Sequence, residues 1–245
     1  MAKTEKVIFW DFAGTLAVER SRKTGGTGWR AAIMDVLDEC EPGHGIDSEK
    51  IRSFLQEGFP WHKPEEPHTH LAMPDAWWQA LELVFIRCYR GIGYSSERAA
   101  ELATQVRRHM IKSERYVLYE DTITVLAELK AKGWRHVMLS NHMPELPEIV
   151  KMIGLSPYIA CFITSGVTGY EKPHPQAFRI ALDTAGNPEK AWMIGDNIES
   201  DINGAENAGI PAILVRSPRT EDVKYYAASL NDVVGIIEDN PDISR

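Results

Sequence analysis

The chain has 245 residues and a formal net charge of −8, and 44% of its residues are hydrophobic and 25% charged. These values are ordinary for a folded globular protein with one large core or two smaller ones. The negative charge argues against nucleic acid or an anionic membrane as the main partner, although an anionic small molecule can still bind beside a local cation.

The cysteines and the amino terminus bear on where the protein works. Cys40, Cys88 and Cys161 are scattered and form no C-x-x-C pair, a usage typical of a reducing compartment. The segment Met1–Lys6 lacks the apolar region of a signal peptide, and no run approaches about 18 consecutive apolar residues. We therefore expect a cytoplasmic protein without a membrane span.

The first predicted element is a buried strand over the apolar run Val7–Trp10. Asp11 follows it directly and opens the sequence DFAGTL. A carboxylate at the end of such a strand lies where open α/β sheets bind their ligands. Alone, Asp11 is better explained as a turn or N-cap residue, and three motifs farther along the chain reverse that preference.

Between residues 18 and 118 we find four helical patterns and no convincing strand. The patterns are Gly28–Cys40, Ser48–Gly58, Asp75–Arg90 and Ser95–Lys112. Polar residues before the second and fourth patterns offer N-cap chemistry. The third pattern is too apolar for a solvated helix, so we expect a helical bundle. Its apolar face fits burial in the bundle and a dimer surface equally well, which leaves both a monomer and a homodimer open.

From about residue 120 onward, predicted strands and helices alternate. The strands are His136–Leu139, Cys161–Thr164, Ala191–Ile194 and Ile210–Val215, and the helices are Thr122–Lys132, Leu146–Ile153 and Gln176–Ala185. This alternation predicts an α/β fold with a doubly wound, Rossmann-like parallel sheet. We expect residues 1–17 and 119–245 to form the α/β core domain and residues 18–118 to form an inserted helical cap.

Polar residues follow the predicted strands of the core. Ser140 and Asn141 follow one strand, Lys172 lies in the loop after the next, and Asp196 follows the one after that, with Asp201 five positions farther on. Each residue alone is explained as a cap, turn or solvated loop residue. Because the ends of parallel strands share one edge of a sheet, their ordered occurrence favours a common site that includes Asp11.

In this arrangement the chain resembles the haloacid dehalogenase (HAD) superfamily. The resemblance rests on four motifs in order: DxAGT at residues 11–15, an apolar residue before Ser140-Asn141, Lys172-Pro173, and GDxxxxD at residues 195–201. It covers the core and the position of the cap. It implies a Mg²⁺-dependent hydrolase of phosphate monoesters that forms an aspartyl-phosphate and acts on a small phosphorylated metabolite.

The resemblance also implies roles around the metal. Asp11 would attack phosphorus, and one of its oxygens, the Ala13 carbonyl and Asp196 would hold Mg²⁺, a hard ion that prefers oxygen ligands. Asp201 would orient these ligands from behind.

Further residues are implied to bind the substrate. Ser140 would hydrogen-bond the phosphoryl oxygens with help from Asn141, and Lys172 would supply positive charge against both the nucleophile and the phosphate. Gly14 and Thr15 are assigned to the same binding loop, where glycine permits close approach of backbone to ligand.

Ala13 departs from the pattern of the family's phosphatases, which usually carry Asp two positions after the nucleophile. That Asp protonates the leaving group and later activates water, and losing such help typically costs about 10²–10⁴-fold in rate. One interpretation is a phosphatase impaired by alanine at this position. A second is C–P bond cleavage of the kind performed by phosphonoacetaldehyde hydrolase, which resembles this motif and uses a cap lysine as a Schiff base. A third is a non-catalytic, phosphate-binding relative.

The cap residues that bear on these alternatives are less clearly marked. The candidate lysines are Lys23, Lys50, Lys63 and Lys112, and none lies in a recognised lysine motif. The proline-rich segment Phe59–His70 either lines the substrate pocket or connects two helices. The glycine-rich residues 25–28 predict a flexible hinge for cap movement.

Overall fold

The computed structural model describes residues 5–20 and 28–241. Within them the core is a six-stranded sheet of order β5-β4-β1-β6-β7-β8 in which every neighbouring pair is parallel. The strands are β1 Lys6–Trp10, β4 Arg135–Ser140, β5 Ile159–Thr164, β6 Lys190–Gly195, β7 Ala212–Val215 and β8 Tyr225–Ala227. The predicted doubly wound α/β fold is confirmed, and β8 is a strand that the sequence patterns did not reveal.

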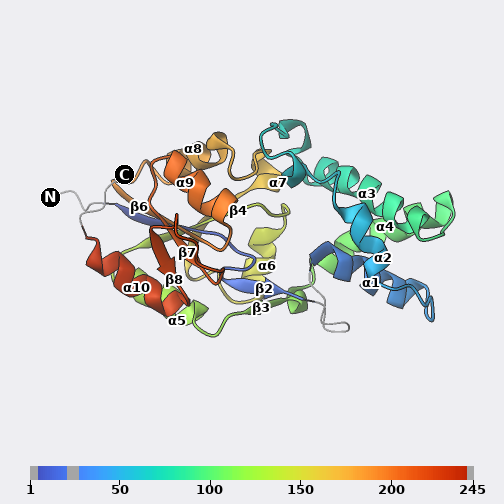
Figure 1. Ribbon diagram of the computed structural model, residues 1–245, viewed down its shortest axis with the longest axis horizontal. Coiled ribbons are helices and arrows are strands. Elements are labelled where there is room, and N and C mark those ends of the chain that lie inside the picture. The colour runs from blue at the N-terminus through green and yellow to red at the C-terminus, as the bar shows by residue number, and fades with distance from the viewer. Residues whose placement is uncertain (1–4, 21–27, 242–245) are drawn as a thin grey trace.

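Helices cover both faces of this sheet (Figure 1). On β1 the side chains alternate: Ile8 and Trp10 belong to one apolar cluster, and Val7 and Phe9 belong to the other. The first cluster includes residues of α5 (Thr122–Ala131), α6 (Leu146–Met152) and α10 (Leu230–Asp239), and the second includes residues of α8 (Pro175–Thr184) and α9 (Gly204–Asn207). Because the strand is buried on both sides, its sequence is continuously apolar rather than alternating.

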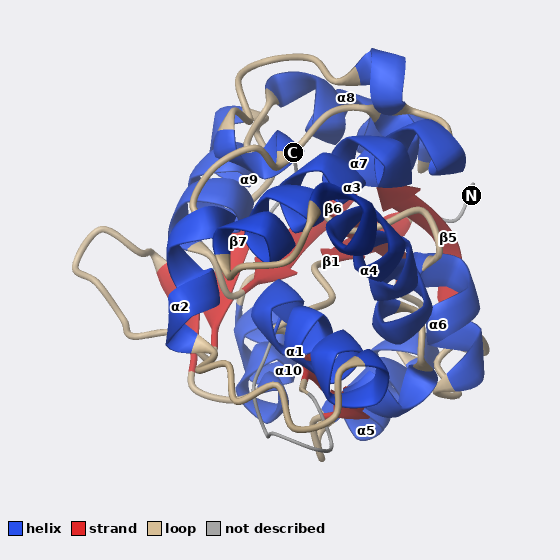
Figure 2. Cartoon of the chain, turned by 90° about the vertical axis from the view of Figure 1, so that its right-hand side faces the viewer, coloured by secondary structure: helices blue, strands red, loops and turns tan. Residues whose placement is uncertain are grey.

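In the described part of the predicted cap, the α-helices are α1 (Gly28–Cys40), α2 (Glu49–Arg52), α3 (Pro74–Gly91) and α4 (Ser96–Met110). Ser95 caps α4 as expected, since its hydroxyl accepts a hydrogen bond from the Arg98 amide at 3.2 Å. The apolar third pattern is explained within one chain, because Trp77 and Trp78 are each 2% exposed in the bundle. Figure 2, seen from the cap side, shows these helices in front of the sheet.

The second helical prediction was too long. It extended to Gly58, whereas α2 ends at Arg52 and continues only as a 3₁₀ turn over Ser53–Leu55. The guanidinium of Arg87 in α3 donates to the carbonyl oxygens of Phe54 and Glu57, at 2.8 and 2.6 Å. A tertiary contact therefore binds the Phe54 carbonyl, which a helix reaching Gly58 would have used in its own ladder.

The prediction that residues 18–118 contain no strand was wrong at both ends of that stretch. Strands β2 (Ala17–Glu19) and β3 (Tyr116–Leu118) pair antiparallel where the chain leaves and re-enters the core, between the two halves in Figure 1. Their three-residue length gives no periodic signal, and they form only because the cap brings residues 19 and 116 together. The expected domain boundaries fall in this ribbon. Among the described residues, no helix is long and apolar enough to cross a membrane.

Candidate active site

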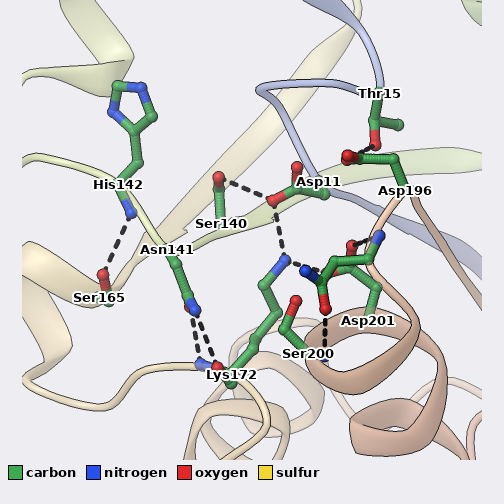
Figure 3. A network of polar contacts seen from close by, with 11 residues as sticks. Asp11, Thr15, Ser140, Asn141, His142, Ser165, Lys172, Asp196, Ser200 and Asp201 are labelled. Atoms are coloured by element: carbon green, nitrogen blue, oxygen red, sulfur yellow. Dashed lines mark hydrogen bonds and ion pairs between the residues drawn. The ribbon is translucent and has the colours of Figure 1, made fainter. Parts of the chain in front are cut away.

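The ends of three adjacent strands, in the order β4-β1-β6, bring Asp11, Ser140 and Asp196 together: Ser140 is the last residue of β4, and Asp11 and Asp196 directly follow β1 and β6. Lys172 reaches the same place from the loop after β5, and Asp201 reaches it from the segment after β6 (Figure 3). All five line one cavity of about 520 Å³ between core and cap. The sequence-predicted constellation therefore forms a single cluster.

Asp11 is held by two donors on one oxygen. Its Oδ1 accepts hydrogen bonds from the Ser140 hydroxyl at 2.9 Å and from the Lys172 ammonium at 2.8 Å (Figure 3). Among the described residues, no donor is bound to its Oδ2. This arrangement fixes the carboxylate and leaves one oxygen available to a ligand in the cavity.

Lys172 is 2% exposed and lies between two carboxylates, with Asp201 Oδ1 at 2.5 Å. Burial alone would lower the pKa of Lys172, but Asp11 and Asp201 outweigh it and raise that pKa above its usual value. The lysine is therefore a permanent positive charge beside Asp11.

Three carboxylates gather around this single cation. Ligand oxygens of Asp11, Asp196 and Asp201 lie within 4.8 Å of one another. Burial, followed by the charges of the other two carboxylates, raises the pKa of Asp196 to about 7, and burial raises that of Asp201 to about 6. A divalent cation would relieve this repulsion, and clustered carboxylate oxygens with the nearby Ala13 carbonyl are the ligands that Mg²⁺ prefers. The residues present fit a magnesium ion.

Two residues expected to bind substrate lie against Asp196 instead. The Thr15 hydroxyl donates to Asp196 Oδ1 at 2.9 Å. Gly14 has a φ of +93°, and a Cβ there would lie 2.4 Å from Asp196 Oδ2. Glycine is therefore required both by backbone conformation and by the close carboxylate, and the geometry gives Gly14 and Thr15 a role in positioning Asp196.

Asn141 is bound to the backbone of another site residue. Its side-chain amide donates to the Lys172 carbonyl at 2.8 Å, and its side-chain oxygen accepts from the Lys172 amide at 2.7 Å. The two bonds fix the backbone that carries Lys172. His142, the next residue, lines the cavity, and burial lowers the pKa of its imidazole to about 4, so the ring is neutral at physiological pH.

The loop after β7 contributes two residues that the sequence interpretation missed. Arg216 donates to the Thr15 carbonyl at 3.0 Å, pairs with Asp121 and lies 3.7 Å above the Tyr119 ring. Ser217 donates its hydroxyl to the Asp196 carbonyl. The available signal was their position directly after the fifth predicted strand, at the edge of the sheet shared by the other site residues.

The positions of the candidate cap residues bear on the alternatives left open by the sequence. Lys50 and Lys63 are exposed, Lys112 is half-buried, and none of these three lines the cavity; Lys23 lies outside the described residues. In the segment Phe59–His70, Trp61 lines the cavity and also stacks on Phe59, so this segment both lines the pocket and packs within the cap. Of the predicted glycine hinge, residues 25–27 also lie outside the described residues.

Comparison with known proteins first defines the class. Residues 5–209 match the family model of haloacid dehalogenase-like hydrolases. Among solved structures, the putative HAD-hydrolase YfnB from Bacillus subtilis has a TM-score of 0.70 at 17% identity, covering 96% of this chain and 100% of that one. The 2-haloacid dehalogenase from Pseudomonas syringae has a TM-score of 0.67 at 21% identity, covering 96% and 99%.

The chain therefore belongs to the haloacid dehalogenase-like hydrolase family. Phosphoserine phosphatase of Thermus thermophilus is 38% identical over 144 residues, which cover 58% of this chain and 57% of that protein. Glyceraldehyde 3-phosphate phosphatase of Methanothermobacter thermautotrophicus is 32% identical over 134 residues, covering 54% and 59%. The matched segments span less than two thirds of either relative.

Proposed function

We propose that this protein is a Mg²⁺-dependent phosphate-monoester hydrolase that forms an aspartyl-phosphate on Asp11 and turns over slowly because Ala13 provides no acid–base group. The observation that carries the proposal is the geometry of Asp11, which lines the cavity and whose Oδ1 accepts hydrogen bonds from Ser140 and Lys172, while no donor among the described residues is bound to its Oδ2. The two phosphatase relatives support the reaction class. The YfnB structure, described as bound to magnesium, supports the metal.

Phosphoryl transfer needs positioning and charge neutralisation more than covalent help. Asp11 would attack phosphorus through its free oxygen, with Ser140 and Lys172 binding the phosphoryl group. Mg²⁺ would be held by Asp11, the Ala13 carbonyl and Asp196, with Asp201 supporting them, and it would offset the phosphate charge. The substrate would be a small phosphorylated metabolite that fits the cavity.

Ala13 determines what happens after this first transfer. Its methyl group can neither protonate a leaving alkoxide in the first transfer nor activate the water that cleaves the acyl-phosphate in the second. With an ester whose leaving group departs without protonation, such as an aryl phosphate, only the second step is impaired, so the phosphoryl-enzyme should accumulate. C–P bond cleavage through a Schiff base is less well supported, since Lys50, Lys63 and Lys112 do not line the cavity.

The experiment is to trap this intermediate. The protein is mixed with an aryl phosphate and Mg²⁺, quenched in acid and digested, and the peptide containing Asp11 is examined by mass spectrometry for a phosphoryl group. We expect the adduct in the natural chain, none with Asp11→Asn, and none without a divalent cation. A natural chain that binds phosphate but never carries the adduct would refute the enzymatic proposal and favour a non-catalytic relative.

A further inference from the structure

The cavity above Asp11 has two chemically different parts. Around Asp11 it is lined by the groups already described. Its lining also includes the cap residues Trp29, Trp61 and Met110, together with Met143 and the acidic residue Glu19. Among the described lining residues, Lys172 is the single cationic side chain, and both of its ion pairs are with carboxylates of the site. The part of the cavity that would hold the leaving group therefore offers acidic and aromatic groups.

Glu19 places a carboxyl at this wall from the last residue of β2. Its side chain is 14% exposed, and its Oε1 lies 3.3 Å from the guanidinium of Arg115. Arg115 also pairs with Asp35 and donates to the Gly28 carbonyl. One guanidinium is thus shared between two carboxylates, so Glu19 retains acceptor capacity toward a ligand.

The two indoles form a fixed aromatic wall. Trp61 stacks on Phe59 with ring centroids 4.5 Å apart and on Trp29 at 5.8 Å. Trp29 also stacks on Phe85 at 5.6 Å. Rings that are held by such packing lose little freedom when a ligand binds, and indole surface that the neighbouring rings leave uncovered can attract an organic cation.

We propose that the leaving group of the substrate carries an organic ammonium group, which Glu19 pairs with and Trp29 and Trp61 surround. The substrate class is then the phosphate monoesters of amino alcohols. This inference rests on the proposed function, since it assumes that the phosphate lies at Asp11. We therefore expect such esters to bind more tightly than esters with an anionic leaving group, because the described lining residues provide no unpaired cation for an anion.

The test uses binding, so that slow turnover at Ala13 does not obscure it. Isothermal titration calorimetry with Mg²⁺ measures the affinity of the natural chain for phosphocholine, glycerol 3-phosphate and 3-phosphoglycerate, with inorganic phosphate as the reference. We expect phosphocholine to bind about 10-fold tighter than glycerol 3-phosphate, in line with a desolvated cation–π contact reinforced by a carboxylate. 3-Phosphoglycerate should bind more weakly than both.

Variants then assign the preference to the named residues. Glu19→Gln and Trp61→Leu should each reduce the preference for phosphocholine several-fold and leave the affinity for inorganic phosphate unchanged, which also shows that the variants fold. Trp61→Phe, which keeps a ring, should retain most of the preference. Glu65→Gln makes the same chemical change on an exposed cap residue outside the cavity and should have no effect.

The outcomes separate the two proposals. If inorganic phosphate does not bind the natural chain in the presence of Mg²⁺, the proposed function itself fails. If it binds but phosphocholine and glycerol 3-phosphate bind equally, the ammonium site is refuted while the phosphatase proposal stands. A preference that survives both Glu19→Gln and Trp61→Leu also refutes the ammonium site.

Discussion

Ala13 lines the cavity beside Asp11 and Asp196 and is exposed, so a longer side chain at this position extends into the space above the nucleophile. We expect Ala13→Asp to raise steady-state hydrolysis of an aryl phosphate by about 10²–10⁴-fold, which is the range that a positioned general acid or base contributes. This corresponds to about 3–5 kcal/mol of transition-state free energy. Because the position is hydrated, the added charge should change the free energy of unfolding by only about 1 kcal/mol.

The gain should fall on one step. An aryl leaving group departs without protonation, so the first phosphoryl transfer is already possible in the natural chain, and hydrolysis of the phosphoryl-enzyme limits turnover. Rapid-quench measurement of the released phenol should show a burst followed by slow turnover in the natural chain. In Ala13→Asp the steady-state rate should rise and the burst should disappear.

The matched control is Ala13→Asn, which has nearly the same size as the aspartate variant but cannot exchange a proton at neutral pH. It should turn over as slowly as the natural chain. If aspartate and asparagine at this position give the same rate, the missing acid–base group does not explain the activity of this chain. A flat response to both substitutions, with no burst in any form, would instead favour a non-catalytic phosphate-binding protein.

Three further predictions concern charged side chains. Lys172→Met leaves the buried carboxylates of Asp11 and Asp201 without their cation, so chemical denaturation should show a loss of about 3–5 kcal/mol in the free energy of unfolding. A variant as stable as the natural chain would contradict the burial of this ion pair. Arg107 in α4 donates to Glu145 of the core at 2.6 Å, and Arg107→Met removes this contact. Amide hydrogen exchange should then speed up in α3 and α4. Unchanged exchange would show that the Arg107–Glu145 pair does not stabilise the packing of these helices on the core. Burial raises the pKa of Glu171 from 4.5 to about 7, so the folded state retains a proton that the unfolded state releases. The contribution of Glu171 to the free energy of unfolding is fully present below about pH 4.5 and is lost as the pH rises to about 7. Glu171→Gln removes this titration, so the melting temperature of the variant, compared with that of the natural chain, should rise between these two pH values. A constant difference between the two melting temperatures would argue against the raised pKa.

The convergence of Asp11, Ser140 and Asp196 could be predicted because it depends on topology alone. Each residue directly follows a continuously apolar run, and such runs form parallel strands whose carboxyl ends share one edge. No side-chain geometry is needed for that conclusion. The prediction of a doubly wound α/β fold succeeded for the same reason, since period and order along the chain determine it.

Contacts between distant segments could not be predicted in the same way. Arg216 and Thr15 lie 201 positions apart, and their hydrogen bond depends on a loop conformation in which Arg216 adopts a φ of +60°. Asn141 was expected to face the phosphate, yet its amide is satisfied by the backbone of Lys172. The β2–β3 ribbon is too short to leave a pattern. In each case the partner is chosen by the assembled structure, and local sequence contains no information about it.

The electrostatics of the cluster bear on which interpretation of Ala13 holds. Keeping Asp201, Lys172 and Asp11 together in a buried site costs desolvation free energy, and well-packed apolar residues usually stabilise such a position as well or better. A fold that needed this region only for stability would gain nothing from three carboxylates around one ammonium. The arrangement is explained if Asp11 must stay ionised and aimed at a phosphoryl group beside a divalent cation. Under the proposed function, the groups that would bind phosphate are present and the acid–base group is absent at Ala13. The trapped phosphoryl-enzyme is therefore the observation that separates an impaired phosphatase from a protein that only binds phosphate.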